Sequence, residues 1–261
     1  MQTKEVQGKL WSSAPTDWAK YIEPRFIPMY RAVLTRLSLN EEKMILDAGC
    51  GSGLFLSMVI PTGAAVHGID AAPGLLEISK KRLPGVTLML EDLEDIPFSD
   101  ETFDYVAGFN SFQYAGSFQN ALAEARRVTK RFGKVVIGIW GKEEDCDAGD
   151  VLKAVGALLP PPPPGTPGPF ALSQAGKVEA ICASVGLKVL ERQNVPCPWH
   201  FAGVEELQKG FMCTGPCVKA AEVVGEEKVK AAIRKSAEPF VLADGLYRMR
   251  NQFTFFITER T

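Results

Sequence analysis

The sequence predicts an α/β fold in which a mostly parallel sheet lies between two layers of helices. From Lys43 to Trp140, short and almost continuous apolar runs alternate with helix-like stretches. Such runs are typical of strands that are buried on both faces. The first run is followed by a glycine-rich stretch. In open parallel sheets, a glycine-rich loop after the first strand is typical of a ligand-binding site. The 261 residues are enough for one or two domains with a sizeable core.

Composition and charge exclude several classes of protein. The chain is 46% hydrophobic, so it has enough apolar surface to fold. It carries 29 Lys and Arg against 31 Asp and Glu, and this balance argues against a nucleic-acid partner. No apolar run approaches the roughly 18 residues of a membrane-spanning helix, so we expect no membrane span. The first residues lack an apolar export signal, and we therefore expect a cytoplasmic protein whose six cysteines are reduced.

Residues 1–40 are rich in aromatic residues and are interrupted by prolines. The prolines limit helices here to short pieces. Trp18, Tyr21 and Ile22 have the i, i+3, i+4 spacing of an amphipathic helix. We expect an N-terminal helical cap over a binding site, and simple packing of these aromatic residues on the core is the alternative.

The first half of the chain contains five predicted strands and three predicted helices. The strands are expected at residues 44–46, 64–69, 86–90, 103–109 and 134–140. The helices are expected at residues 54–59 and 73–82 and after Ser117. Pro73 fits the first turn of its helix, where the missing N–H costs no hydrogen bond. Ser117 is a typical N-cap residue for the third helix.

The second half begins with a break in this alternation. The segment 141–169 contains the run Pro160–Pro164, which predicts a stiff, extended connection. A helix at residues 173–185 and a strand at 187–195 are expected next, then helices within 203–238 and a closing strand at 253–258.

The loop after the first strand carries the strongest local signal. It runs from Asp47 to Gly53 and has glycine at every second position from Gly49. Glycines allow a tight turn and the close approach of a ligand to the backbone. The dinucleotide-binding pattern would require glycine where Leu54 stands, and no lysine of a phosphate-binding loop follows. The loop is therefore not predicted to hold phosphate groups.

Two further strands end in carboxylates. Asp70 closes the second strand about 20 residues after the first glycine, where an acidic residue can accept hydrogen bonds from both hydroxyls of a ribose. Asp92 follows the third strand and is placed to accept a hydrogen bond from an adenine amino group. Each alone is typical of a turn or a solvated loop. Together with the glycine loop they indicate a nucleoside site.

From about residue 43 to residue 140 the sequence resembles the class I S-adenosylmethionine-dependent methyltransferases. The resemblance rests on motifs in the family's order and spacing: Ile45–Gly53, Gly68–Asp70, Asp92–Phe98, Phe103–Val106 and Glu124–Val128, with Gly133 and Lys134 before the fifth strand. The small-molecule branch that includes the ubiquinone and menaquinone C-methyltransferases is the most similar.

The resemblance implies a Rossmann-like, seven-stranded sheet of order 3-2-1-4-5-7-6 with an antiparallel strand 7, helices on both faces and a helical cap. Residues 253–258 would be strand 7 and residues 187–195 strand 6. The methyltransferase domain would span residues 41–261, and a helical insertion at about 200–240 would lie on the substrate side.

The resemblance also implies the cofactor, S-adenosylmethionine, and the residues that bind it. Asp47 and the backbone of Gly49 and Gly51 would lie against its methionine part, and Asp70 would hold the ribose hydroxyls. The other implied contacts are Asp92, Leu93 and Ala71 at the adenine, and Asn110 at the reacting centre. Acidic loops and aromatic faces suit the positive sulfonium group.

The methyl acceptor is expected to be a small organic molecule with an apolar or aromatic body, because both regions that would cover the site are aromatic. Methyl transfer needs a general base only if the acceptor must lose a proton. His200 and Tyr114 are the candidate catalytic residues. A zinc site at Cys197, His200, Cys213 and Cys217 is disfavoured by the intervening prolines, and we expect no metal.

Two alternatives remain from the sequence. One is a nicotinamide-dependent oxidoreductase on a related sheet. The other is a cofactor-binding partner protein that does not catalyse methyl transfer.

Overall fold

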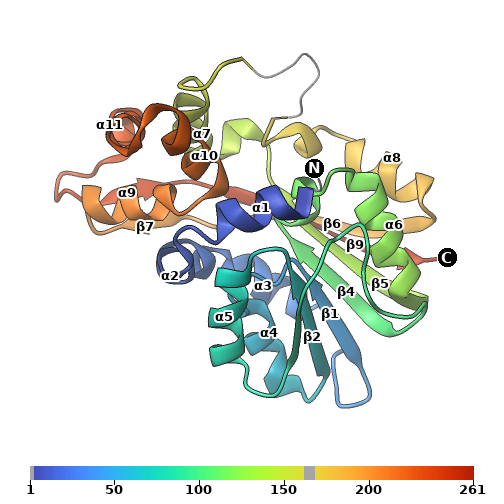
Figure 1. The fold of residues 1–261 in the computed structure, drawn as a ribbon. Coiled ribbons are helices and arrows are strands. Elements are labelled where there is room, and N and C mark those ends of the chain that lie inside the picture. Colours follow the sequence, from blue (N-terminus) through green and yellow to red (C-terminus); the bar gives the residue numbers. More distant parts are fainter. Residues whose placement is uncertain (1–2, 162–167) are drawn as a thin grey trace.

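A computed structural model describes residues 3–161 and 168–261 and contains a seven-stranded sheet of order β3-β2-β1-β4-β5-β9-β6 (Figure 1). The strands are β1 (Met44–Ala48), β2 (Ala65–Asp70), β3 (Thr87–Leu90), β4 (Phe103–Phe109), β5 (Thr129–Trp140), β6 (Leu187–Pro196) and β9 (Gln252–Arg260). The expected strand order is confirmed, with β9 as the seventh strand, antiparallel to both β5 and β6.

The register of the central strands fixes where a ligand can bind. β1 pairs in parallel with β2 and β4, and Asp47 lies beside Gly68 and Ala107. The loops that follow these strands therefore meet at one edge of the sheet, the carboxyl edge. In open sheets of this kind, ligands bind at that edge.

Helices cover both faces of the sheet. One face is covered by α3 (Ile27–Leu34), α4 (Leu54–Val59) and α5 (Pro73–Arg82), and the other by α6 (Phe118–Val128) and α8 (Lys177–Ser184). α6 buries Ala121, Leu122 and Ala125 on one side, as its amphipathic sequence predicts. The Ser117 hydroxyl accepts a hydrogen bond from the Asn120 N–H, so the expected N-cap is confirmed.

The N-terminal region consists of the short pieces that its prolines predict: α1 (Thr3–Trp11), α2 (Pro15–Asp17), a π-helical turn (Trp18–Ile22) and a 3₁₀ turn (Glu23–Phe26). We call residues 3–26 the cap. It crosses the carboxyl edge of the sheet (Figure 1). Lys4 Nζ donates to the Leu90 carbonyl, and the Gly74 N–H donates to Ser12 Oγ. The division of the chain into regions at residue 40 stays a prediction.

The segment 141–169 corrects one expectation. It is not a simple extended connection, because it contains α7 (Ala148–Gly156), whose Val151 and Val155 are buried. Their i, i+4 spacing is helical, and the nearby prolines obscured that signal. Residues 162–167, which include most of the run Pro160–Pro164, lie outside the described residues.

The predicted insertion contains three helices and a small second sheet. The elements are α9 (Val204–Met212), α10 (Gly215–Val224), α11 (Glu226–Ala237), β7 (Trp199–Phe201) and β8 (Tyr247–Met249). Short 3₁₀ turns complete the fold at Ile60–Thr62, Phe112–Tyr114, Glu143–Asp145, Ala171–Ser173 and Glu238–Phe240. None of the helices that the structure describes is long and apolar enough to cross a membrane.

Candidate cofactor and acceptor site

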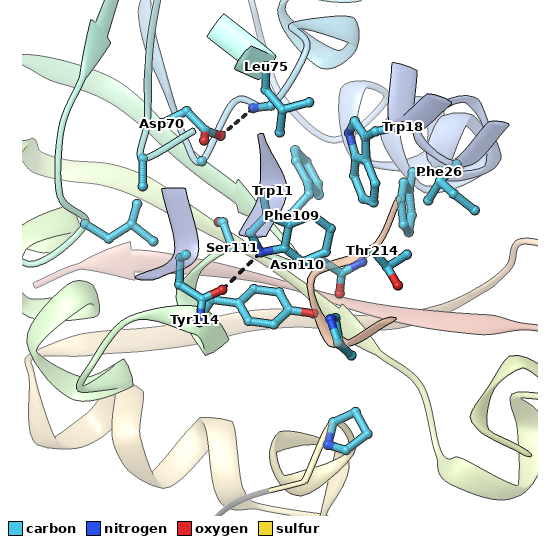
Figure 2. A pocket seen from close by; sticks show the side chains of 18 of the residues that line it. Trp11, Trp18, Phe26, Asp70, Leu75, Phe109, Asn110, Ser111, Tyr114 and Thr214 are labelled. Atoms are coloured by element: carbon cyan, nitrogen blue, oxygen red, sulfur yellow. Dashed lines mark hydrogen bonds between the residues drawn. The ribbon is translucent and has the colours of Figure 1, made fainter. Parts of the chain in front are cut away.

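A cavity of about 1150 Å³, including its open mouth, lies at the carboxyl edge of the sheet. The loops after β1, β2, β3 and β4 form one part of its wall, and the cap, the insertion, the end of β5 and α7 contribute to the rest (Figure 2). Seven of the eight residues expected to bind the cofactor line it: Gly49, Gly51, Asp70, Ala71, Asp92, Leu93 and Asn110. Tyr114 also lines it, whereas Asp47, at the start of the glycine loop, is not among the lining residues.

The glycine loop presents bare backbone to the cavity. Gly49 has a φ of +88°, and a Cβ there would come within 2.2 Å of the Ser111 Cβ. The Ser111 hydroxyl donates to the Ala48 carbonyl at 2.6 Å and so joins the ends of β4 and β1. Gly51 has a φ of +52°, and the nearest atom to its missing Cβ is Trp18 Nε1 at 3.5 Å. A side chain at either position would disturb this loop or fill the cavity.

Asp70 holds the glycine loop and still faces the cavity. Its carboxylate accepts hydrogen bonds from the Gly51 N–H at 2.7 Å and the Ala72 N–H at 2.8 Å. Burial raises the pKa of Asp70, and these backbone hydrogen bonds partly oppose the rise. A carboxylate oxygen can accept two hydrogen bonds. Each oxygen of Asp70 therefore keeps room for one more donor, such as a ribose hydroxyl.

Asp47 lies at the start of the glycine loop, is 3% exposed, and has an oxygen, Oδ1, without a hydrogen-bond partner. Burial, and then the charges of Asp70 and Glu23, raise the pKa of Asp47 well above its usual range. Glu23 is also 3% exposed, but it pairs with Arg82 at 2.7 Å and accepts the Leu54 N–H. The resulting negative potential suits a cationic ligand. This unpaired oxygen and the bare glycines fit the methionine part of S-adenosylmethionine.

The loops after β3 and β4 complete this part of the wall. Asp92 Oδ1 accepts the Glu94 N–H at 2.9 Å, which shapes the turn that brings Leu93 to the cavity. Asn110 has a φ of +51°, an uncommon value outside glycine that asparagine tolerates. Its N–H donates to the Gly138 carbonyl at 2.8 Å. Figure 2 shows the Asn110 side chain at the cavity, near Tyr114 and Phe109.

Aromatic rings form much of the remaining wall. Its rings come from the cap, the sheet and the insertion: Trp11, Trp18, Phe26, Phe109, Tyr114, Trp140, Trp199 and Phe211. Trp11 contacts Trp18 and Tyr114 edge to face, with centroids 5.0 and 5.3 Å apart. Burial raises the pKa of Tyr114 to about 12, so its phenol is neutral at physiological pH.

His200 does not join this site. It lies in β7, where Trp199 and Phe201 are buried and the histidine between them is exposed. Successive side chains of a strand point to opposite faces, so Trp199 lines the cavity and His200 lies outside. The acid–base role expected for His200 is therefore withdrawn. Cys213 and Cys217 are buried away from this exposed ring, and the described residues contain no group of three or more potential metal ligands.

Several cavity residues were missed by the sequence analysis. Lys4 and Gln7 reach the wall from α1, Leu152 from α7, and Thr214 from the start of α10. Glu23 was missed because a glutamate before a proline is typical of the start of a short helix. Only its burial beside Leu54 and Arg82 distinguishes it.

Comparisons with known proteins agree with this geometry. Residues 46–137 match a family described as a methyltransferase domain. The malonyl-[acyl-carrier protein] O-methyltransferase of Serratia marcescens is 31% identical over 118 residues, which cover 45% of this chain and 46% of that protein. The demethylmenaquinone methyltransferase of Tropheryma whipplei is 34% identical over 110 residues, which cover 41% and 46%. The chain thus spans about half the length of these curated relatives.

A solved structure from Bacillus halodurans, described with a provisional methyltransferase assignment, has the same fold. Its TM-score is 0.60 at 16% identity, and the match covers 88% of this chain and 98% of that one. The strand order, the motifs along β1 to β5 and the matched family agree. Residues 46–137 therefore match the methyltransferase-domain family, and the strand order is that of the class I S-adenosylmethionine-dependent methyltransferases, whose cofactor is S-adenosylmethionine.

Proposed function

We propose that the protein transfers a methyl group from S-adenosylmethionine to a small organic acceptor with an apolar or aromatic body. One observation carries this proposal: a single cavity joins the glycine loop, Asp70 and Asp92 to a wall of aromatic rings. The polar part suits a nucleoside joined to a cationic amino acid. The aromatic part suits an acceptor that is removed from water.

The cofactor would lie along the carboxyl edge of the sheet. The ribose hydroxyls would donate to the free positions on Asp70, and Ala71, Asp92 and Leu93 would enclose the adenine. The cofactor's ammonium group would lie near Asp47, whose Oδ1 has no other partner. When bound, S-adenosylmethionine supplies an electrophilic methyl group on a positively charged sulfur.

The chain's own contribution would be orientation and exclusion of water. Such positioning supplies much of the rate when the leaving group is already good. Among the residues that the structure describes, the ionisable side chains that line the cavity are Lys4, Asp70, Asp92 and Tyr114. Lys4 is bound to the Leu90 carbonyl and Glu91, and the Tyr114 phenol stays protonated. We therefore propose that Tyr114 and Asn110 orient the acceptor by hydrogen bonds and that Tyr114 accepts no proton.

The lining also limits the acceptor. Its cationic side chain, Lys4, is already paired, so no unpaired cation in the described lining favours a phosphate or carboxylate group on the acceptor. The relative from Tropheryma whipplei is named for demethylmenaquinone, a substrate class that would suit aromatic walls. We propose a neutral, quinone-like or lipid-like acceptor.

The two alternatives from the sequence predict different binding behaviour. A nicotinamide cofactor needs a glycine-rich helix start for its diphosphate, and Leu54 occupies that position. A non-catalytic partner protein would bind S-adenosylmethionine without turnover. The test is to incubate the protein with methyl-labelled S-adenosylmethionine and a panel of demethylated aromatic and isoprenoid acceptors, then extract into organic solvent.

Label in the organic phase supports the proposal, and a panel of carboxylated or phosphorylated acceptors of similar size serves as the matched control. Equal transfer to the charged panel would contradict the acceptor class. Binding of S-adenosylhomocysteine with no transfer to either panel would favour the non-catalytic alternative.

A further inference from the structure

The Trp18 indole N–H is a buried hydrogen-bond donor without a partner. Trp18 lies in the π-helical turn of the cap and lines the cavity. In Figure 2 it stands between Leu75 and Phe26. Unpartnered buried donors are uncommon in folded proteins and call for an explanation. Short π-helical segments are also frequent at functional sites.

The position of this N–H relative to the glycine loop is the second observation. Trp18 Nε1 lies 3.5 Å from the point that a Cβ on Gly51 would occupy. Contacts with Trp11 at 5.0 Å and Phe26 at 6.1 Å between ring centroids hold the indole in place. A ligand that approaches the bare backbone of Gly51 therefore meets the Trp18 N–H.

Two unpartnered groups of opposite kind thus flank the glycine loop. Asp47 Oδ1 can only accept hydrogen bonds while ionised, and Trp18 Nε1 can only donate. The amino-acid end of S-adenosylmethionine is a zwitterion, with an ammonium group that only donates and a carboxylate that only accepts. The acceptor at Asp47 matches the ammonium, and the donor at Trp18 matches the carboxylate.

Besides Asp70, which accepts the Gly51 N–H at 2.7 Å, Glu23 is an acidic group near Trp18 that could oppose this match. Its Oε1 lies 3.8 Å from the same point above Gly51. Its charge, however, is paired with Arg82 at 2.7 Å, and its Oε1 accepts the Leu54 N–H at 3.2 Å. These two donors offset the repulsion that Glu23 would exert on a ligand carboxylate.

We infer that the Trp18 N–H donates a hydrogen bond to the α-carboxylate of the cofactor, so that the cap contacts the amino-acid end of the ligand. This assignment rests on the proposed function, because it requires S-adenosylmethionine in the cavity. It makes Trp18 a positioning residue: by fixing the carboxylate, it sets the place of the neighbouring sulfonium group. The cap therefore contributes affinity only for a nucleoside that carries the amino acid.

The test compares two ligands that differ only in this part. S-adenosylhomocysteine carries the carboxylate, whereas 5′-methylthioadenosine keeps the adenine, ribose and sulfur but lacks the amino acid. Trp18→Phe removes the N–H and keeps an aromatic ring. Trp11→Phe is the matched variant, since Trp11 Nε1 already donates to Gln7 Oε1 at 3.0 Å. Calorimetry gives the Kd of both ligands for the wild type and each variant.

We expect Trp18→Phe to weaken the binding of S-adenosylhomocysteine about 10- to 150-fold, as for the loss of a hydrogen bond to a charged group. Binding of 5′-methylthioadenosine should change less than about twofold, which also shows that the variant is folded. The ratio of the two affinities should not change in Trp11→Phe.

An unchanged ratio in Trp18→Phe would overturn the assignment, whether both ligands still bind as before or both weaken alike. The latter result would mean that the ring only packs. If neither ligand binds the folded wild type, the proposed cofactor is itself wrong. That outcome is distinct from a failure of the Trp18 assignment alone.

Discussion

Replacing Asp70 with asparagine tests the proposed nucleoside site most sharply. The Asp70 carboxylate accepts the Gly51 N–H at 2.7 Å and the Ala72 N–H at 2.8 Å, which leaves one free accepting position on each oxygen. Asparagine keeps one of the two oxygens and puts an NH₂ donor in place of the other. The variant should therefore lose at least one hydrogen bond from the ribose.

The expected loss follows from the charge on the acceptor. A hydrogen bond to a charged group contributes about 1.5–3 kcal/mol. Removal of this hydrogen bond should weaken the binding of S-adenosylhomocysteine roughly 10- to 150-fold. Because 5′-methylthioadenosine has the same ribose, its binding to the variant should be weaker by a similar factor. This behaviour differs from that expected for Trp18→Phe, which should affect only the ligand that carries the amino acid.

The assay is calorimetry at several pH values, with Asp95→Asn as the control. Asp95 is exposed in the loop after β3, and its substitution changes the net charge by the same amount. Burial raises the pKa of Asp70, so in the wild type the carboxylate should be protonated, and affinity lost, at a higher pH than for an ordinary aspartate. Asp70→Asn should not show this loss. Wild-type affinity in a folded Asp70→Asn variant would show that the Asp70 carboxylate does not bind the ribose.

Three further predictions test other parts of the site. Asp47→Asn should raise the melting temperature of the ligand-free protein at pH 8 by roughly 2–4 °C per kcal/mol gained. Because the pKa of Asp47 is raised in the folded protein, keeping this carboxylate ionised at high pH lowers the stability of the fold. The increase in melting temperature caused by Asp47→Asn should therefore become smaller as the pH is lowered. An increase that does not depend on pH would contradict this explanation. Tyr114→Phe and His200→Ala should keep the pH dependence of methyl transfer, since the Tyr114 pKa is about 12 and His200 is exposed. Loss of the acidic limb of either pH–rate profile would reveal a general base. Gly8→Ala should weaken S-adenosylhomocysteine and expose α1 to limited proteolysis, because its Cβ would meet the Ala71 carbonyl oxygen at 2.2 Å; unchanged cleavage would show that α1 does not depend on this contact.

The sheet and the loops at its carboxyl edge could be predicted because their signals are local. A buried parallel strand reads as an apolar run, and the residue at its end can be counted along the chain. Asp70 was found in this way, from its position at the end of a strand and its distance from the glycine loop. The structure places it beside Gly51, where that reasoning required it.

The cover of the site depends on contacts between distant segments and could not be predicted in the same way. β7 has only three residues, and its partner β8 lies more than 40 residues further along the chain. Without that pairing nothing in the sequence shows which way His200 points. Glu23 pairs with Arg82, and the Trp18 N–H lies near Gly51. Both partners are distant in the sequence, so these roles could not be inferred from it.

The most direct test of the central claim is calorimetric titration of the wild-type protein with S-adenosylmethionine and S-adenosylhomocysteine, beside NAD and NADP. We expect the first two ligands to bind with affinities in the micromolar range and neither nicotinamide cofactor to bind. Binding of NAD or NADP alone, or of none of the four by folded protein, would contradict this expectation.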